Sequence, residues 1–304
     1  MTHWTANDIP NQKGRLAVVT GTGGLGLEDA LALTRAGGEV IIAGRNPDKG
    51  AEAVAQVRRE VPSALVRFER LDLADLASVT AFGERLRGQA DRLDLLINNA
   101  AVMVPPTRVE TADGFELQLG TNYLGHFALT AHLMPLLRKT PGARVVSLSS
   151  VAARAGAIDF DDLNGRRRYR SMSAYGQSKL ACLMFAFELQ RRSEAGGWGV
   201  ASLAAHPGIS RTDLLLNAPG EGSLSRFVRK TFPFLFQPAA QGALPTLFAA
   251  TAPDARPGAY YGPDGGGELR GFPTEARVPR QALDEAVARR LWAVSEDLTG
   301  VSFG

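Results

Sequence analysis

Apolar and polar residues are arranged along the chain in two distinct ways. Short, continuous apolar runs are separated by longer segments in which apolar residues recur every three or four positions. The first pattern is typical of buried parallel strands, and the second is typical of amphipathic helices. Strands are therefore predicted at residues 16–20, 39–43, 64–71, 94–101, 144–150, 200–205 and 258–262. Helices are predicted at residues 27–36, 49–61, 76–89, 111–137, 182–189, 241–250 and 281–296, the fourth as one helix or two.

This alternation predicts an α/β fold with a parallel sheet of about seven strands, helices on both faces, and ligands at the carboxyl ends of the strands. Neither an internal repeat nor a long linker interrupts the 304 residues, so we expect a single domain over residues 1–304. Residues 1–14 look like an extended leader. Residues 213–240 mix glycine, serine and proline with an apolar stretch, and form either an ordinary core-facing loop or a lid over an apolar substrate.

A glycine-rich turn joins the first predicted strand to the first helix. Its sequence is Thr20-Gly21-Thr22-Gly23-Gly24-Leu25-Gly26. A strand, a glycine turn and a helix in this order surround an anion with backbone N–H groups and a helix N-terminus. The expected anion is a dinucleotide pyrophosphate, so the predicted fold is of the Rossmann type, with a doubly wound parallel sheet.

The second predicted strand ends at Gly44-Arg45-Asn46. In a dinucleotide fold this strand end reaches the adenosine ribose, where an acidic residue pairs with a free 2′-hydroxyl and an arginine accommodates a 2′-phosphate. Arg45 stands there and no acidic residue does, so the sequence favours NADP over NAD. The alternative is that Arg45 is a surface arginine.

Tyr175 and Lys179 lie four residues apart at the start of an apolar segment of helical character, so they share one face of a helix. A phenol has an unperturbed pKa of about 10. A neighbouring ammonium group would lower that pKa and make the phenol a proton donor and acceptor near neutral pH. The alternative is an ordinary pair on a partly exposed helix.

Asn122 lies inside another predicted helix. An asparagine is unfavourable there unless its amide has a specific role, and His126, four residues later, is expected to be structural.

Composition narrows the function classes. Hydrophobic residues make up 45% of the chain and charged residues 21%, with a net charge of +3, which is typical of a globular protein. The densest basic cluster, residues 166–170, could contact a phosphate or form a solvated loop, and nothing else indicates nucleic acid. The single cysteine predicts that there is no internal disulfide, and with only four scattered histidines a metal site is not expected. The sequence has neither a signal region nor an apolar run long enough to span a membrane, so we expect a cytoplasmic protein.

Several short motifs follow one another in a characteristic order. They are Thr20-Gly21 with Gly24 and Gly26, Asn98-Asn99-Ala100-Ala101, Asn122, Ser150, Tyr175-x-x-x-Lys179 and Pro207-Gly208. Over roughly residues 15–215 this order resembles the short-chain dehydrogenase/reductase family. The 25-residue interval from Ser150 to Tyr175 is similar to that of its retinol dehydrogenase and WW-domain oxidoreductase branch. Members of that branch typically act on lipophilic alcohols, aldehydes or ketones and often prefer NADP.

The resemblance implies a role for each catalytic residue. Tyr175 would be the general acid in carbonyl reduction and the base in alcohol oxidation, and Ser150 would hydrogen-bond the substrate oxygen, in preference to its neighbour Ser149. Lys179 would lower the tyrosine pKa and hold the nicotinamide ribose, while Asn122 would hold a water that links Lys179 to solvent. The expected cofactor-binding residues are Gly21, Thr22, Gly23, Gly24, Leu25, Gly26, Arg45, Asn46, Asp72, Leu73, Asn99, Ala100, Ala101, Tyr175, Lys179, Pro207, Gly208, Ile209 and Thr212.

The glycine turn departs from the family pattern by one residue. The family usually has Thr-Gly-x-x-x-Gly-x-Gly, whereas here only Thr22 and Gly23 separate Thr20-Gly21 from Gly24-Leu25-Gly26. A position that often contacts the ribose phosphate is missing. Arg45 would then carry more of the 2′-phosphate recognition.

Two other functions fit the same residues. One is reduction of an activated carbon–carbon double bond, in which Tyr175 would protonate carbon. The other is a non-catalytic NADP-binding sensor or scaffold, which would have no need of the Asn-Ser-Tyr-Lys set. The expected partner is an apolar small molecule. The apolar face of residues 182–189 could be a dimer seam or a buried core face, so a homodimer and a monomer both remain open.

Overall fold

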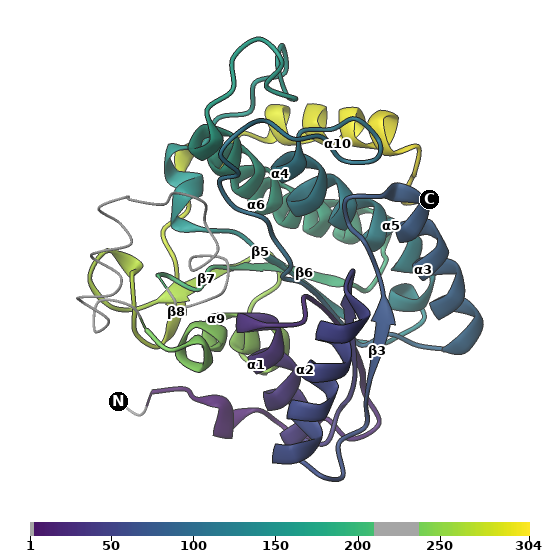
Figure 1. Ribbon diagram of the computed structural model, residues 1–304. Helices are drawn as coiled ribbons and strands as arrows, with labels where there is room; N and C mark the ends of the chain where they lie inside the picture. The colour runs from purple at the N-terminus through teal and green to yellow at the C-terminus, as the bar shows by residue number, and fades with distance from the viewer. Residues whose placement is uncertain (1–2, 210–236) are drawn as a thin grey trace.

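The computed structural model describes residues 3–209 and 237–304 (Figure 1). Thr212 and residues 213–236 of the expected substrate loop therefore lie outside the described residues. A twisted sheet with helices on both faces makes up the described part. The prediction of a Rossmann-type α/β fold with a doubly wound sheet is confirmed.

The sheet has eight strands in the order β3-β2-β1-β4-β5-β6-β7-β8. They are β1 (Leu16–Thr20), β2 (Glu39–Gly44), β3 (Val66–Arg70), β4 (Leu95–Asn98), β5 (Arg144–Leu148), β6 (Ala201–Ala205), β7 (Tyr260–Pro263) and β8 (Pro273–Glu275). The first seven run parallel, and β8 pairs antiparallel with β7. The sequence predicts the parallel strands, whereas β8 consists of Pro-Thr-Glu and has no apolar run by which to find it.

The main helices are α1 (Gly24–Arg35), α2 (Pro47–Glu60), α3 (Leu76–Gln89), α4 (Leu117–Leu119), α5 (Gly125–Arg138), α6 (Ser171–Gly196), α9 (Ala239–Thr251) and α10 (Glu285–Thr299). Several predicted helix boundaries are wrong. The helix expected at residues 182–189 is much longer, because α6 runs from Ser171 to Gly196. The helix expected from residue 111 begins at Leu117, because the Glu116 side chain caps it by accepting from the Leu119 N–H. The last helix begins at Glu285, because Asp284 caps it at the Val287 N–H and a separate 3₁₀ turn precedes it.

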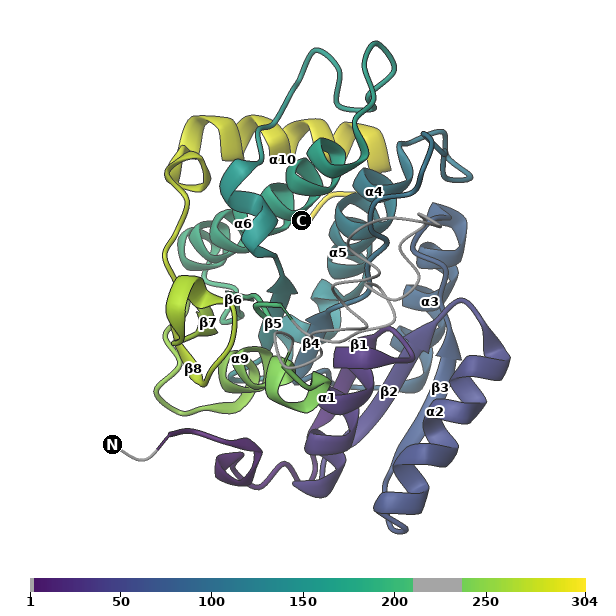
Figure 2. The same ribbon diagram turned by 60° about the vertical axis from the view of Figure 1, so that its left-hand side comes forward.

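Neighbouring residues of the central strands enter different cores. Val18 belongs to a cluster with residues of α3, α5, α6 and α10, whereas Val19 belongs to a cluster with residues of α1, α2 and α9. Figure 2 shows α6 and α10 on one side of the sheet and α1 and α2 on the other. Strands that are covered on both faces must be apolar at successive positions, which explains the continuous apolar runs in the sequence.

The helix α10 covers α5 and α6. The ring centroid of Trp292 in α10 lies 5.0 Å from that of Phe127 in α5 and 5.7 Å from that of Phe185 in α6. Phe303, beyond α10, lies 4.4 Å from Trp292. Residues 182–189 are all buried within the single chain. Residues 182–189 were expected to form either a dimer seam or a buried core face, and in the structure they form a buried core face.

The leader is only partly extended. Ala6–Asp8 form a 3₁₀ turn capped by Thr5. Trp4 packs edge-on against Phe248 of α9, with ring centroids 5.3 Å apart, and the Gln12 N–H donates to the Ala36 carbonyl at 2.8 Å. The leader is thus held against α1 and α9. Across the described ranges, no helix combines the length and the apolar character that crossing a membrane requires.

Candidate active site

The strands β1 and β4 lie side by side at the point where the strand order reverses. Such a reversal leaves a crevice at the carboxyl ends of the strands. Thr20, the last residue of β1, joins the two strand ends, since its Oγ1 accepts hydrogen bonds from the Asn99 and Ala100 N–H groups, both at 2.9 Å. The Asn99 side chain donates in return to the Thr20 carbonyl at 2.7 Å. This network fixes the floor of the crevice.

The glycine turn after β1 has no room for a side chain at Gly21 or at Gly26. A Cβ on Gly26 would lie 2.6 Å from Asn99 Nδ2 and 2.9 Å from the Gly21 carbonyl oxygen. Gly21 has a φ of +104°, in the region that favours glycine. The N-cap of α1 is Gly23, so no side chain caps the first N–H groups of the helix. Although it is one residue shorter than the family pattern, the turn presents bare backbone donors that fit the pyrophosphate of a dinucleotide.

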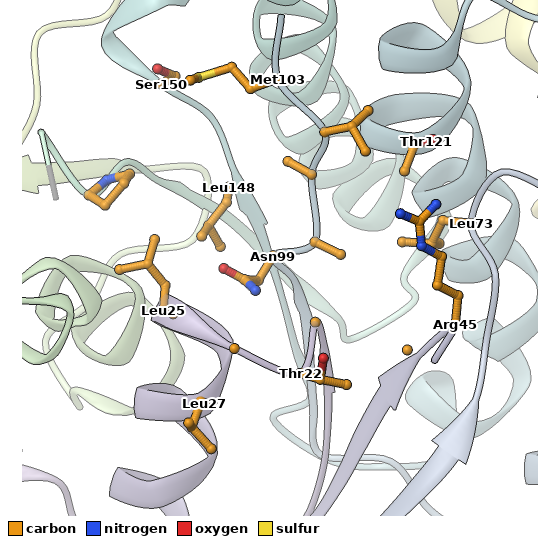
Figure 3. Close-up of a pocket in the computed structure, with 18 of the residues that line it drawn as sticks. Thr22, Leu25, Leu27, Arg45, Leu73, Asn99, Met103, Thr121, Leu148 and Ser150 are labelled. Carbon is orange, nitrogen blue, oxygen red and sulfur yellow. The ribbon is translucent and has the colours of Figure 1, made fainter. Parts of the chain in front are cut away.

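A cavity of about 1190 Å³ extends from this turn. It exceeds the usual range of about 300–1,000 Å³ for small-molecule sites, which suits an extended ligand. Figure 3 shows Ser150 and Met103 at one end and Arg45 at the other. The predicted site residues that line it are Gly21, Thr22, Gly23, Gly24, Leu25, Arg45, Asn46, Asp72, Leu73, Asn99, Ala100, Ala101, Ser150, Tyr175, Lys179, Pro207, Gly208 and Ile209.

Two predicted residues, Gly26 and Asn122, do not line the cavity but lie behind its wall, and Thr212 is outside the described residues. The sequence reasoning missed other lining residues, among them Lys49, Glu52, Gln56, Val102, Met103, Leu148, Val151 and Met172. Some could have been found by position. Val102 and Met103 directly follow the Asn98-Asn99-Ala100-Ala101 motif, and the three α2 residues recur at helical spacing after Asn46.

Arg45 lies directly after β2, at the end of the cavity away from Ser150. Its side chain is exposed, and it forms no ion pair with any residue of the two described ranges. The next residue, Asn46, caps α2 by accepting from the Asp48 and Lys49 N–H groups at 2.9 and 3.1 Å. The Arg45 guanidinium is therefore available to an anionic group in the cavity, whereas the Asn46 side chain is already engaged.

Ser150 and Tyr175 meet at the opposite end of the cavity. Tyr175 lies in the first turns of α6 and is buried, and both residues line the cavity. Burial raises the pKa of Tyr175 to about 12, and the nearby Ser150 hydroxyl only partly opposes that increase. The neighbouring Ser149 hydroxyl donates instead to the Lys179 carbonyl at 2.8 Å. Ser150 is thus the serine that reaches the phenol.

Lys179 lies one turn after Tyr175 on the same helix face. Its Nζ donates to the Leu148 carbonyl at 3.0 Å and lies 6.0 Å from the Tyr175 ring centroid. Burial lowers the pKa of Lys179. The net change at Tyr175 is therefore opposite to the lowering that the Tyr-Lys spacing predicts, because removal from water is the largest influence on the phenol.

Asn122 lies in a π-helical turn, Gly120–Leu124, between α4 and α5. Such turns often occur at functional sites. Its Oδ1 accepts from the Val102 N–H at 2.8 Å, and its Nδ2 donates to the Val102 carbonyl and to the Ser178 hydroxyl, both at 3.0 Å. The amide therefore anchors the cavity-lining residue Val102 to α6. The water relay that the resemblance implies for Asn122 stays a prediction.

His126 is a structural residue, as expected. Its Nδ1 contacts the Asn122 carbonyl at 2.9 Å, so this nitrogen must carry the proton, and its Nε2 accepts from the Thr20 hydroxyl at 2.9 Å. Burial lowers the pKa of His126 to about 4. The neutral imidazole thereby connects the end of β1 to the π-helical turn that holds Asn122.

A sequence model of the short chain dehydrogenase family matches residues 15–220. The chain belongs to this family. This short-chain dehydrogenase is 41% identical to the polyprenol dehydrogenase of Mus musculus over 97% of its own length and 87% of the relative. It is 39% identical to retinol dehydrogenase 12 of the same organism, over 95% of this chain and 88% of that one. These relatives confirm the retinol dehydrogenase-like branch that the motif spacing indicates.

Solved structures support the same fold. A crystal structure of an uncharacterized protein from Mycobacterium paratuberculosis shares 40% identity with this short-chain dehydrogenase, with a TM-score of 0.82 and full coverage of both chains (100% each). The NADP complex of RhlG from Pseudomonas aeruginosa is 22% identical with a TM-score of 0.64, and covers 82% of this chain and 94% of that one. The second likeness concerns the fold alone.

Proposed function

We propose that this short-chain dehydrogenase is an NADP-dependent oxidoreductase that interconverts a lipophilic ketone or aldehyde with the corresponding alcohol. The observation that carries the proposal is that Ser150 and Tyr175 line one end of a long cavity whose other end holds Arg45. A bound nicotinamide dinucleotide would supply or accept the hydride at the substrate carbon. A cytoplasmic location, and a monomer or a homodimer, stay predictions from the sequence.

Preference for NADP rests on Arg45. A guanidinium that forms no ion pair among the described residues can make charge-assisted hydrogen bonds to a 2′-phosphate. Lys49, on the first turn of α2, lines the same end of the cavity and adds a second positive charge. A free 2′-hydroxyl would leave both cations without an anionic partner among residues 3–209 and 237–304.

Proton transfer would fall to Tyr175. In carbonyl reduction the phenol donates its proton to the substrate oxygen, which the Ser150 hydroxyl holds by a hydrogen bond. Because burial raises its pKa, the phenol carries near neutral pH the proton that it would donate. In alcohol oxidation the same phenol must act as the base, and the Lys179 ammonium is the positive charge of this chain that could stabilise its phenolate.

An apolar substrate suits the surroundings of Tyr175. The cavity there is lined by Val102, Met103, Leu148, Val151 and Met172. Methionine side chains adapt to irregular apolar ligands. The names of the relatives, a polyprenol dehydrogenase and a retinol dehydrogenase, are consistent with long apolar alcohols.

Replacement of Tyr175 by Phe tests this proposal. Without its proton donor, the variant should lose turnover of ketones and aldehydes by about 10²–10⁴-fold, while NADPH binding, followed by nucleotide fluorescence, changes little. The matched control is Tyr261→Phe, because the Tyr261 hydroxyl accepts from the Arg256 N–H outside the cavity. A Tyr175→Phe variant with wild-type turnover would exclude Tyr175 as the acid. A product that keeps its carbonyl group but has lost the carbon–carbon double bond would favour double-bond reduction.

A further inference from the structure

A carboxylate, an imidazole and a guanidinium meet behind the cavity wall. Glu268 lies in the segment that connects β7 to β8 (Figures 1 and 2), His206 directly follows β6, and Arg154 lies in the 3₁₀ turn after β5. We call Glu268, His206 and Arg154 the Glu268 cluster. None of the three lines the cavity itself. The cluster connects three segments that are distant in the sequence, and two of these segments do line it.

The hydrogen bonds of His206 assign its protonation. Its Nδ1 accepts from the Gly208 N–H at 3.2 Å, so the proton of the neutral ring must sit on Nε2, which donates to Glu268 Oε2 at 3.0 Å. The His206 side chain is 1% exposed, and burial lowers its pKa. The Glu268 carboxylate thus holds His206 in the tautomer that accepts from Gly208. In the other tautomer the His206 Nδ1–H would point at the Gly208 N–H, and two hydrogen-bond donors would face each other.

Gly208 belongs to the turn Pro207-Gly208-Ile209, all three residues of which line the cavity. Gly208 has a φ of +64°, and a Cβ there would lie 2.4 Å from the Leu269 carbonyl oxygen. The same carbonyl accepts from the Ile209 N–H at 2.8 Å. The turn therefore rests directly on the segment that carries Glu268, and the cluster and this backbone contact hold it from two sides.

The second arm of the cluster leads to Ser150. Arg154 pairs with Glu268 Oε2 and donates to the Gly267 carbonyl at 3.0 Å. The 3₁₀ turn Val151–Ala155 that contains Arg154 begins at Ser150, whose hydroxyl accepts from the Ala152 N–H at 3.2 Å. One carboxylate thus ties together the turn at Gly208 and the turn that presents Ser150.

The segment around Glu268 is built for this contact. Glu268 has a φ of +60°, which a non-glycine residue rarely adopts, and its Oε1 accepts from the Arg277 N–H at 2.8 Å. Gly262 of β7 leaves space for the imidazole, because a Cβ there would lie 2.1 Å from His206 Nε2. Strained backbone held by specific contacts often accompanies functional sites.

We propose that Glu268 is a positioning residue for the end of the cavity that receives the nicotinamide and the reacting carbon. Through His206 it fixes the Pro207-Gly208-Ile209 turn, and through Arg154 it fixes the turn that carries Ser150. This inference rests on the proposed function. It predicts that losing the carboxylate disturbs the Ser150 end of the cavity and leaves the Arg45 end unchanged.

The test compares two ligands on the full chain. On the proposed function NADPH would occupy both ends of the cavity, whereas 2′,5′-ADP carries only the adenosine half with its phosphates. In Glu268→Gln, we expect the dissociation constant for NADPH to rise about tenfold and kcat to fall by about ten- to a hundredfold, since small misplacements of reacting groups are costly. The dissociation constant for 2′,5′-ADP should stay unchanged. The matched control is Glu285→Gln, which removes an exposed ion pair with Arg289 on α10.

A second variant separates the contact of Glu268 with Arg154 from its contact with His206. It also tests the inference if Glu268→Gln does not fold. Arg154, with 38% of its side chain exposed, can be replaced without opening the core. Arg154→Gln should lower kcat while NADPH affinity stays near that of the wild type, because its arm leads to Ser150. A variant that matches the wild type in both constants and in kcat would overturn the inference.

Other outcomes are equally decisive. If Glu268→Gln weakens NADPH and 2′,5′-ADP to the same extent, the carboxylate acts on general stability and the positioning role is wrong. If the wild type binds both ligands and Glu268→Gln equals it, the inference fails while the proposed function stands. A wild type that binds neither ligand overturns the proposed function, and the inference with it.

Discussion

The buried imidazole of His126 should make stability depend on pH in a specific window. In the folded protein burial lowers the pKa of His126 from 6.5 to about 4, whereas the unfolded chain keeps an ordinary histidine. At about 1.4 kcal/mol per pH unit, this difference corresponds to about 3 kcal/mol. Between these two pKa values the unfolded state binds more protons. The folded protein should therefore lose stability as the pH falls from 6.5 to 4, because protonation favours the unfolded chain.

Urea unfolding of the wild type and of His126→Gln at a series of pH values measures this effect. Other groups also titrate in this range, and their contributions cancel in the difference between the two proteins. We expect the stability advantage of the wild type to shrink by about 3 kcal/mol from pH 7 to pH 4. The control is His3→Gln, since the His3 side chain is 55% exposed. A difference that stays constant with pH would refute the assignment of a neutral, buried His126 between Thr20 and Asn122.

Two further changes test other parts of the structure. Arg45→Gln should raise the KM for NADPH by about 10- to 100-fold, the equivalent of one charge-assisted hydrogen bond, and leave the KM for NADH unchanged. An equal change for both cofactors would contradict 2′-phosphate recognition. The control is Arg59→Gln, because Arg59 lies on α2 outside the cavity. Trp292→Ala should lower the free energy of unfolding by about 3–5 kcal/mol, because Trp292 is 1% exposed among Phe127, Phe185 and Phe303. Urea unfolding measures this change, with the exposed-site variant Arg289→Ala as the control. Equal urea midpoints for the two variants would show that α10 contributes little to the stability of the fold.

The strands were predictable because a parallel sheet covered on both faces needs unbroken apolar runs, as in residues 16–20 and 39–43. The ends of the helices were less predictable from the sequence. The start at Leu117 depends on the Glu116 cap, and the start at Glu285 depends on Asp284, and neither cap stands out in a periodic pattern. The short strand β8 has no apolar run, and it is recognised in the structure by its antiparallel pairing with β7.

In the candidate site, local motifs were readable and long-range contacts were not. The glycine turn, Arg45 and the Tyr175-Lys179 spacing lie within short stretches of sequence. The Glu268 cluster joins residues 62 and 114 positions apart, so that no motif contains it. The raised pKa of Tyr175 cannot be predicted from the sequence for a related reason. Helical spacing shows which groups are neighbours, but burial depends on the whole fold.

The position of α10 has a consequence for the order in which the protein can be made. Trp292 and Phe303 complete the aromatic cluster over α5 and α6. A growing chain has synthesised the whole parallel sheet before residues 285–303 leave the ribosome. Until then the apolar face of α6 is uncovered, at the stage when nascent chains are prone to aggregate and depend on chaperones. The final step of folding should therefore be the docking of α10, and substitutions there should reduce the yield of folded protein before they affect turnover.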